Sequence, residues 1–163
     1  MLWPKFKVRL NNLHTYYTDL LKLIEFLKND LFTGYIQIWK EEKESMIFLD
    51  TGQIVKCIEN KSAKYNDISL QHLIENLGKE EVIHVFDLPE NSVMFWANLY
   101  MGKILYPNLS TDFTDTTRLI LKLKRENLTG WMEIHLRQEK GIIYFQNGEI
   151  IGTCSSWRNW YFN

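Results

Sequence analysis

The sequence predicts an α+β fold built from two tandem, pseudo-symmetric modules, each a helix packed on a three-stranded antiparallel meander, with additional helices between them. Residues 12–58 and 108–154 align without a gap at an offset of 96 positions (108 − 12 = 96) and share fifteen identical residues. Self-similarity at a fixed period indicates a repeat. In both copies a helical period changes to alternation at a Thr-Gly pair and then reaches a second turn glycine. We therefore expect one repeat over residues 1–102 and a second, truncated repeat over residues 103–163.

Each copy is expected to begin with a short strand, at residues 6–10 and at residues 103–106. A helix follows in each, with Thr18 or Thr114 as the candidate N-cap and an aspartate placed favourably at the positive helix end. Apolar residues then recur at the i, i+3, i+4, i+7 spacing of one helix face. These residues are Leu20, Leu23, Ile24 and Leu27 in the first copy, and Leu119, Ile120 and Leu123 in the second.

The sheet is expected to begin at Gly34, where apolar residues start to alternate. Ile36 and Ile38 fall on the helix side, so Tyr35, Gln37 and Trp39 fall on the other face. Residues 46–49 and 142–145 are apolar on both faces, which is typical of a central strand covered on both sides. The pairs Thr51-Gly52 and Asn147-Gly148 predict tight hairpin turns before the last strand of each meander.

The rest of the first repeat is expected to add two helices and a strand. Asp67 is the candidate cap of a helix striped by Leu70, Leu73, Ile74 and Leu77, a strand follows at residues 82–86, and a second helix spans residues 91–101. The second repeat has no such continuation. Residues 155–163 are instead expected to be an aromatic tail.

Composition argues against several functional classes. The net charge of −1 gives no overall attraction to nucleic acid, and no apolar run is long enough to cross a membrane, so we expect a cytoplasmic protein. The two cysteines, Cys57 and Cys154, lie at offsets that differ by one and so on opposite sheet faces, which suits small buried apolar residues. None of the four histidines is spaced for a metal or a catalytic pair. We expect neither an enzyme nor a bound cofactor or metal.

A resemblance to a known family rests on the strand and turn segments. The segments TGYIQI and TGWMEI, then IFLDTGQIV and IYFQNGEII, resemble the PATAN-like domains. Those are bacterial modules found beside response-regulator receiver domains and in motility and developmental signalling proteins. The resemblance covers about forty-five residues of each copy, and Cys57 and Thr153 stand where the family tends to have a smaller residue such as Ala. It implies a non-catalytic adaptor and supplies no catalytic residues.

The function we expect is protein–protein interaction in bacterial signal transduction or motility regulation. The partner would be a response regulator, a motility component or a second copy of the chain, with no nucleic acid and no membrane insertion. Exposed aromatic residues often dominate such contacts. The candidate contact residues are Tyr35, Trp39, Trp131, Trp157, Trp160 and Tyr161. Two alternatives stay open: that these rings only pack within the protein, and that the chain is a sensor binding an apolar or nucleotide-like ligand between the repeats.

Overall fold

A computed structural model describes residues 3, 5–61, 64–136, 139–155 and 158–162. The chain divides into two compact units, and we describe each by itself. The first unit comprises Trp3–Ala97, and the second includes Asn98–Asn163. Both units are α+β with antiparallel sheets, so this part of the predicted fold class is confirmed.

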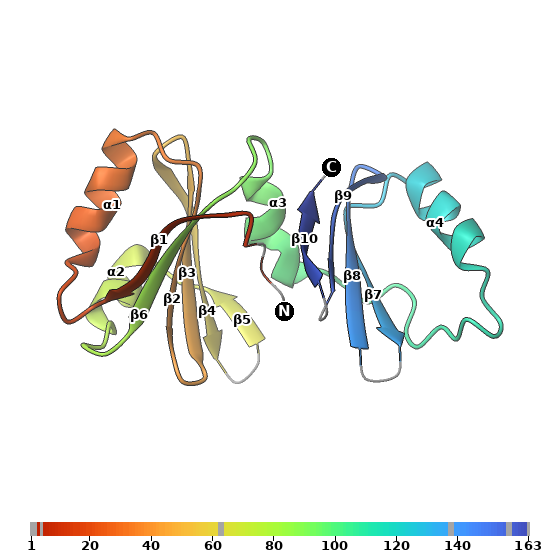
Figure 1. Cartoon of the computed structure of the whole chain (residues 1–163), viewed down its shortest axis with the longest axis horizontal. Helices are drawn as coiled ribbons and strands as arrows, with labels where there is room; N and C mark the ends of the chain where they lie inside the picture. The colour runs from red at the N-terminus through yellow and green to blue at the C-terminus, as the bar shows by residue number, and fades with distance from the viewer. Residues whose placement is uncertain (1–2, 4, 62–63, 137–138, 156–157, 163) are drawn as a thin grey trace. The chain divides into compact units, whose positions relative to one another are not determined.

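The first unit is organised around a six-stranded sheet in the order β1-β6-β2-β3-β4-β5 (Figure 1). The strands are β1 (Lys7–His14), β2 (Gly34–Lys40), β3 (Lys43–Asp50), β4 (Gln53–Lys61), β5 (Lys64–Asp67) and β6 (Val82–Asp87). The helices are α1 (Leu20–Asn29), α2 (Leu70–Glu75) and α3 (Val93–Asn98). The chain then enters the second unit through a 3₁₀ turn, η1 (Leu99–Met101). The predicted meander is the β2-β3-β4 part of this sheet, and β1, β6 and β5 extend it on both sides.

Helices α1 and α2 cover one face of this sheet, which we call the helix face (Figure 1). The predicted apolar stripe of α1 is buried, and Leu27 is 0% exposed. It packs in one cluster with Ile36, Ile38 and other sheet residues. Burying an aliphatic side chain of this size contributes about 1.5 to 3 kcal/mol, so this cluster contributes substantially to the stability of the unit.

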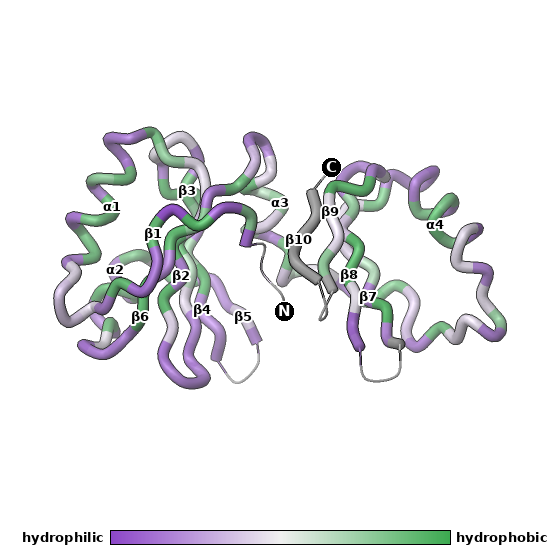
Figure 2. The backbone as a smooth tube through the Cα atoms, in the orientation of Figure 1, coloured by the Kyte–Doolittle hydropathy of each residue, from purple (hydrophilic) through white to green (hydrophobic). Residues whose placement is uncertain are grey.

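The opposite face of the sheet, which we call the open face, is covered over only part of its area. Tyr35 stacks there with Phe86 at a centroid distance of 5.1 Å and lies 5.6 Å from Phe48. Helix α3, which carries the buried Trp96, lies on this side (Figure 1). Towards the β2–β3 turn the chain becomes hydrophilic (Figure 2), so the open face has an apolar end and a polar end.

The second unit holds a four-stranded sheet in the order β10-β9-β8-β7. Its elements are α4 (Thr116–Arg125), β7 (Gly130–Leu136), β8 (Glu139–Gln146), β9 (Glu149–Ser155) and β10 (Arg158–Phe162). Leu123 of α4 is buried, together with Ile142, Tyr144 and Phe145 of β8. The central position predicted for residues 142–145 is thereby confirmed.

A contact between the end of the helix and the glycine turn recurs in both units, and we call it the helix–hairpin contact. In the first unit the Gly52 amide donates to the Phe32 carbonyl at 2.8 Å, and the Thr51 amide donates to Thr33 Oγ1 at 3.0 Å. In the second unit the equivalent bonds are Gly148 N to Leu128 O at 2.8 Å and Asn147 N to Thr129 Oγ1 at 3.0 Å. The turn after the central strand is therefore fixed to the end of the helix by the same four groups in each unit.

Several helix-boundary predictions were wrong by one or two residues. Asp19 and Asp115, not Thr18 and Thr114, are the N-caps, because the carboxylate accepts from free amides of the first helical turn. Ser69 caps α2, because Asp67 is the last residue of strand β5, where it pairs with Ile58 of β4.

Other elements were predicted in the wrong form. The predicted helix over residues 91–101 begins only at Val93, because Asn91 has a left-handed φ of 63°. Residues 103–106 are not a strand. In the first unit β1 is held by β6, and the described part of the second sheet contains no strand in that place. Within the segment expected to be an aromatic tail, residues 158–162 form β10, which pairs with β9.

Among the described residues there is no helix long and apolar enough to cross a membrane.

Candidate functional site

The structure places the six predicted contact residues in different environments. Tyr35 is 0% exposed and stacked in the core, so its assignment as a partner contact was wrong. Trp39 is 43% exposed on the open face of the first sheet. Trp131, in the second unit, is half-buried, and a Cβ on Gly102 would lie 2.3 Å from its ring, so this indole covers Gly102. Trp157 lies outside the described residues, and Trp160 and Tyr161 belong to β10 with side chains that are likewise outside the description.

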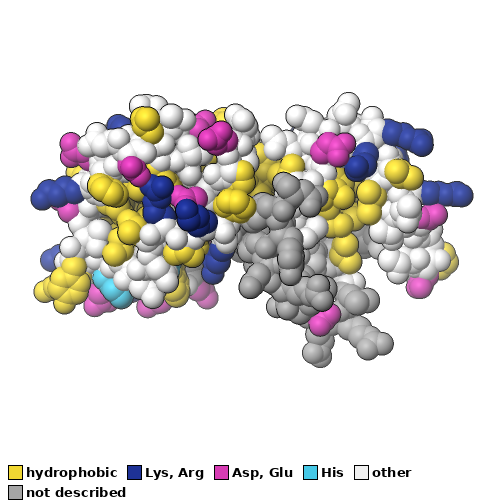
Figure 3. Space-filling view, turned by 45° about the horizontal axis from the view of Figure 1, so that its top comes forward, with side chains coloured by type: hydrophobic (Ala, Val, Ile, Leu, Met, Phe, Trp, Pro, Cys, Tyr) yellow, Lys and Arg dark blue, Asp and Glu magenta, His cyan; other side chains and the backbone are white. Residues whose placement is uncertain are grey.

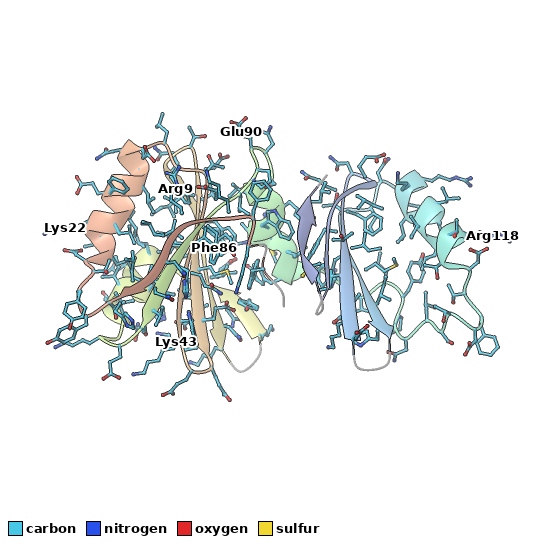
Figure 4. All side chains as sticks on the ribbon, viewed as in Figure 1. Arg9, Lys22, Lys43, Phe86, Glu90 and Arg118 are labelled. Carbon is cyan, nitrogen blue, oxygen red and sulfur yellow. The ribbon has the colours of Figure 1, made fainter. Side chains whose placement is uncertain are left out.

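Trp39 lines a surface pocket at the polar end of the open face. The pocket has a volume of about 530 Å³ and lies within the first unit. Its lining comes from β1 and the residues before it, from β6, from the β2–β3 hairpin and from β4. The lining residues are Lys5, Val8, Asn11, Gln37, Trp39, Glu41, Glu42, Lys43, Glu44, Asn60, His84 and Phe86. Figure 4 labels Phe86, in the middle of the sheet, and Lys43, near the hairpin end.

The indole of Trp39 is held in place by His84. Trp39 Nε1 donates a hydrogen bond to His84 Nε2 at 3.1 Å, and an indole N–H can only donate, so this imidazole nitrogen accepts. The other ring nitrogen, Nδ1, then carries the proton and donates to Asn11 Oδ1. Burial, and secondarily the charge of Lys5, lowers the pKa of His84 below its ordinary value. The neutral imidazole therefore links β1, β6 and β2 and fixes the ring of an exposed tryptophan.

A second hydrogen-bond network fixes Glu44 on the other side of the pocket. Its carboxylate accepts from Gln37 Nε2 and from the Tyr65 hydroxyl. The Tyr65 hydroxyl in turn accepts from Trp3 Nε1 at 3.0 Å. Burial and the hydrogen bond to Glu44 raise the pKa of Tyr65 well above its ordinary value, so this hydroxyl stays a donor at neutral pH. Glu44 is thus a positioned carboxylate beside the pocket.

The pocket has one unused buried acceptor and several carboxylates at its hairpin side. Asn60 Oδ1 is buried and makes no hydrogen bond within the part of the chain that the structure describes. Lys43 lines the pocket, but its ammonium lies 3.4 Å from Glu59 and 3.7 Å from Glu81, which balance its charge. Glu41 and Glu42 at the hairpin are exposed. The hairpin side of the pocket is consequently acidic.

This arrangement has features that suit the binding of a ligand. Both nitrogens of the histidine in the lining are engaged in contacts with neighbouring side chains. No group of three or more metal-ligating side chains occurs among the described residues. A positioned aromatic face, fixed acceptors and a concave shape are what ligand recognition requires.

Neither cysteine is among the described residues that line this pocket. Cys57 and Cys154 are both buried and form no disulfide. Cys57 belongs to the helix-face cluster, where burial raises the pKa of its thiol to about 11. Burial also raises the pKa of Cys154. A thiol with a raised pKa holds little of the thiolate that reacts.

Comparison with known proteins identifies the family. A family model described as an uncharacterized protein conserved in archaea (DUF2226) matches residues 6–100, which is more than half of the chain. The chain belongs to the DUF2226 family. The match runs from just before β1 to η1 and so includes every residue of the candidate pocket except Lys5. No curated protein matches, and no solved structure matches.

Membership of the DUF2226 family overturns the resemblance to the PATAN-like domains. That assignment, with the bacterial signalling and motility role it implied, was wrong, because the matching family is one conserved in archaea. The segments that suggested it consist of core apolar residues, a Thr-Gly pair and turn glycines. Such residues specify a helix followed by a meander, and a fold pattern is shared by many proteins of unrelated function.

Sequence reasoning found Trp39 but missed the residues that position it. The alternation of β2 correctly placed Gln37 and Trp39 together on the face opposite Ile36. The four histidines were considered as metal ligands or catalytic pairs, and nothing local indicates that β6 pairs with β2, so His84 was not connected with Trp39. The register sets His84 opposite Gln37, and only that pairing brings the imidazole to the indole.

Proposed function

We propose that this protein is a non-catalytic interaction module whose first unit binds a segment of a partner protein in the pocket beside Trp39. The observation that carries the proposal is an exposed indole whose orientation is fixed by hydrogen bonds. Trp39 is 43% exposed, yet its Nε1 is bonded to His84, which is bonded to Asn11. Fixing an aromatic ring before binding reduces the entropy lost on association, and tryptophan is among the residues that most often dominate interfaces.

The surroundings of Trp39 favour a partner segment with a cationic side chain. Glu41, Glu42 and Glu44 line the pocket together with Lys5 and Lys43, and the ammonium of Lys43 is balanced by two other glutamates, so the lining carboxylates outnumber the remaining ammonium group. An ammonium or guanidinium group over an indole face, with carboxylates near by, gains both cation–π and Coulomb attraction. On the face shown in Figure 3, hydrophobic side chains of the first unit are interspersed with charged ones. Such a mixed surface is typical of a non-obligate interface.

Capture experiments with matched baits test this function. The full chain, Trp39→Ala and the control Phe26→Ala, which removes an exposed ring from α1, are compared as baits in extract from the source cells. A partner retained by the wild type and by Phe26→Ala, but lost from Trp39→Ala, is expected. That partner's binding segment should then bind as a peptide, and replacing its Lys and Arg by Gln should weaken binding by about tenfold. Equal capture by all three baits would refute the role of the pocket.

A small ligand in the same pocket is the second candidate function. The volume of about 530 Å³ is within the range of small-molecule sites, and Asn60 Oδ1 offers an acceptor that the described protein groups leave unused. Thermal-shift measurements with nucleotides, cyclic dinucleotides and lipids separate the two candidates. A rise in Tm that depends on ligand concentration and disappears in Trp39→Ala would favour the ligand.

We also infer that the two units are copies of one module, as the internal sequence repeat suggests. The helix–hairpin contacts support this, because their hydrogen bonds match at the 96-residue offset. Backbone angles match as well: φ is 76° at Gly52 and 79° at Gly148, and it is 54° at Asn12 and 53° at Asn108. A solution structure of each unit, in which α1-β2-β3-β4 and α4-β7-β8-β9 superpose poorly, would refute the inference.

A further inference from the structure

The edges of the two sheets differ in how they are protected against pairing with another chain. β1 pairs irregularly with β6, with two register shifts, and carries Lys7 and Arg9. β5 has only four residues, and β10 has five and a register shift. Bulges, short length and lysines are the usual means by which an exposed edge strand is prevented from associating. Three of the four edges therefore have a recognisable protection.

β7 has none of these protections. It is seven residues long, contains no Pro or Lys, and pairs with β8 without a register shift. It is the end strand of the second sheet as described. Every second residue of such a strand directs its N–H and C=O away from the sheet, which makes a template for a further strand. Ile134, in its middle, is 38% exposed.

The corresponding strand of the first unit shows what fits beside β7. At the 96-residue offset β7 aligns with β2, and β2 has an antiparallel neighbour, β6, on the side away from β3. In that pairing Ile38 is opposite Ile83 and Gln37 is opposite His84. The β6 sequence that meets these two residues is therefore Ile-His, and β7 itself contains Ile134-His135.

We propose that β7 pairs antiparallel with the β7 of a second copy of this chain, about a two-fold axis at Ile134. In this register Ile134 meets Ile134 of the second copy, as Ile38 meets Ile83. Glu133 meets His135 of the second copy, as Gln37 meets His84, and symmetry creates this pair twice. The inference concerns the second unit and stands whether or not the first unit binds a partner at Trp39.

The side chains of β7 are complementary to themselves in this register. Glu133 and His135 are both exposed, and within one chain the carboxylate is 3.5 Å from the imidazole. Lys140 lies 3.6 Å from the same carboxylate. An imidazole N–H of His135 can donate a hydrogen bond to the opposite Glu133 carboxylate, whereas a shift of register by one residue would put Glu133 opposite Ile134. Symmetric pairing therefore buries the two isoleucines and selects a single register.

Charge substitutions test the pairing by sedimentation velocity of the full chain over a wide concentration range. Wild type is expected to show a concentration-dependent dimer. Ile134→Lys places two like charges at the axis and is expected to weaken dimerisation at least about tenfold. Glu133→Lys should weaken it less, and the swap Glu133→Lys with His135→Glu should restore it. The control Asn66→Lys, on the edge strand β5, should leave it unchanged. A monomeric wild type, or a dimer unaffected by Ile134→Lys, refutes the proposal.

A cross-link tests the register directly. Residues opposite each other in an antiparallel pair have Cα atoms about 4.5 to 5.5 Å apart, which suits a disulfide. Ile134→Cys should therefore form a covalent dimer under mild oxidation, since Cys57 and Cys154 are buried. Ile104→Cys, at a position 83% exposed in the same unit, is the control. Cross-linking of Ile134→Cys no faster than that of Ile104→Cys overturns the register.

Discussion

Replacing Gly52 by alanine should destabilise the first unit by about 3 kcal/mol. Its φ of 76° is left-handed, which costs an alanine about 1 to 2 kcal/mol. A Cβ there would also lie 2.5 Å from the carbonyl oxygen of Lys28, a backbone atom at the end of α1. Relieving this overlap must strain the helix end or weaken the 2.8 Å bond from Gly52 N to Phe32 O, at about 1 to 3 kcal/mol. The unfolded alanine variant has a lower conformational entropy, which offsets about 0.5 kcal/mol of this loss.

Urea denaturation followed by circular dichroism measures this loss. With an m value of about 1.5 kcal/mol/M, a change of 3 kcal/mol lowers the midpoint by about 2 M. Gly148→Ala should produce a similar loss in the second unit, where φ is 79° and the Cβ would lie 2.4 Å from the Lys124 carbonyl oxygen. Gly78→Ala is the matched control, because its Cβ would meet only the Glu81 side chain, at 3.2 Å. If Gly52→Ala and Gly78→Ala have equal midpoints, the helix–hairpin contact does not have the importance argued for it.

Three further predictions concern the core, a cysteine and the histidine. Leu27→Ala, at a position 0% exposed, should lower the free energy of unfolding by about 2 to 5 kcal/mol. Phe26→Ala, at a position 59% exposed, should lower it by less than about 1 kcal/mol. Urea titration measures both losses, and a larger loss for Phe26→Ala would disprove the core assignment. Burial raises the pKa of Cys57 to about 11, so the unfolded thiol ionises first and stability should fall as pH rises from about 9 to about 11. Cys57→Ala should lack that component, and an unchanged alkaline slope would contradict it. The pKa of His84 is lowered in the folded state, so the stability that depends on the neutral ring is complete above about pH 6.5 and is lost as pH falls below it. The Trp39 contribution to fluorescence, taken as wild type minus Trp39→Phe, should change over the same window, and His84→Gln, which keeps an acceptor, should abolish the change.

Features set by neighbouring residues could be predicted from the sequence. The apolar stripe of α1, the alternation of β2 and the glycine turns at Gly52 and Gly148 all follow from local periodicity and backbone angle, and the structure confirms them. Capping was less predictable. Thr18 and Asp19 are adjacent and both are good capping residues, so the sequence does not distinguish them. In the structure the Asp19 carboxylate accepts the bonds from the first helical turn.

Long-range strand pairing could not be predicted in the same way. Alternation shows which residues share a face of a strand, but it does not show which strand lies next to it. β6 lies between β1 and β2, although more than forty residues separate β2 from β6 along the chain. The candidate pocket depends on that order, because Asn11, His84 and Trp39 come from these three strands. Trp39 could thus be identified from the sequence, whereas its partners required the fold.

The course of the chain before β1 has a practical consequence for anyone attaching a label or an affinity handle. Trp3 lies only a few residues before β1, at one edge of the sheet, yet its indole packs on Phe48 of β3 and bonds to Tyr65 of β5, at the other edge. Lys5 and Val8, which follow it, line the pocket. A bulky group fused just ahead of Trp3 would compete for the space in which we expect a partner to bind. Binding assays should therefore use a protein whose amino-terminal handle has been removed, or a small probe on an exposed side chain of α1 such as Lys22.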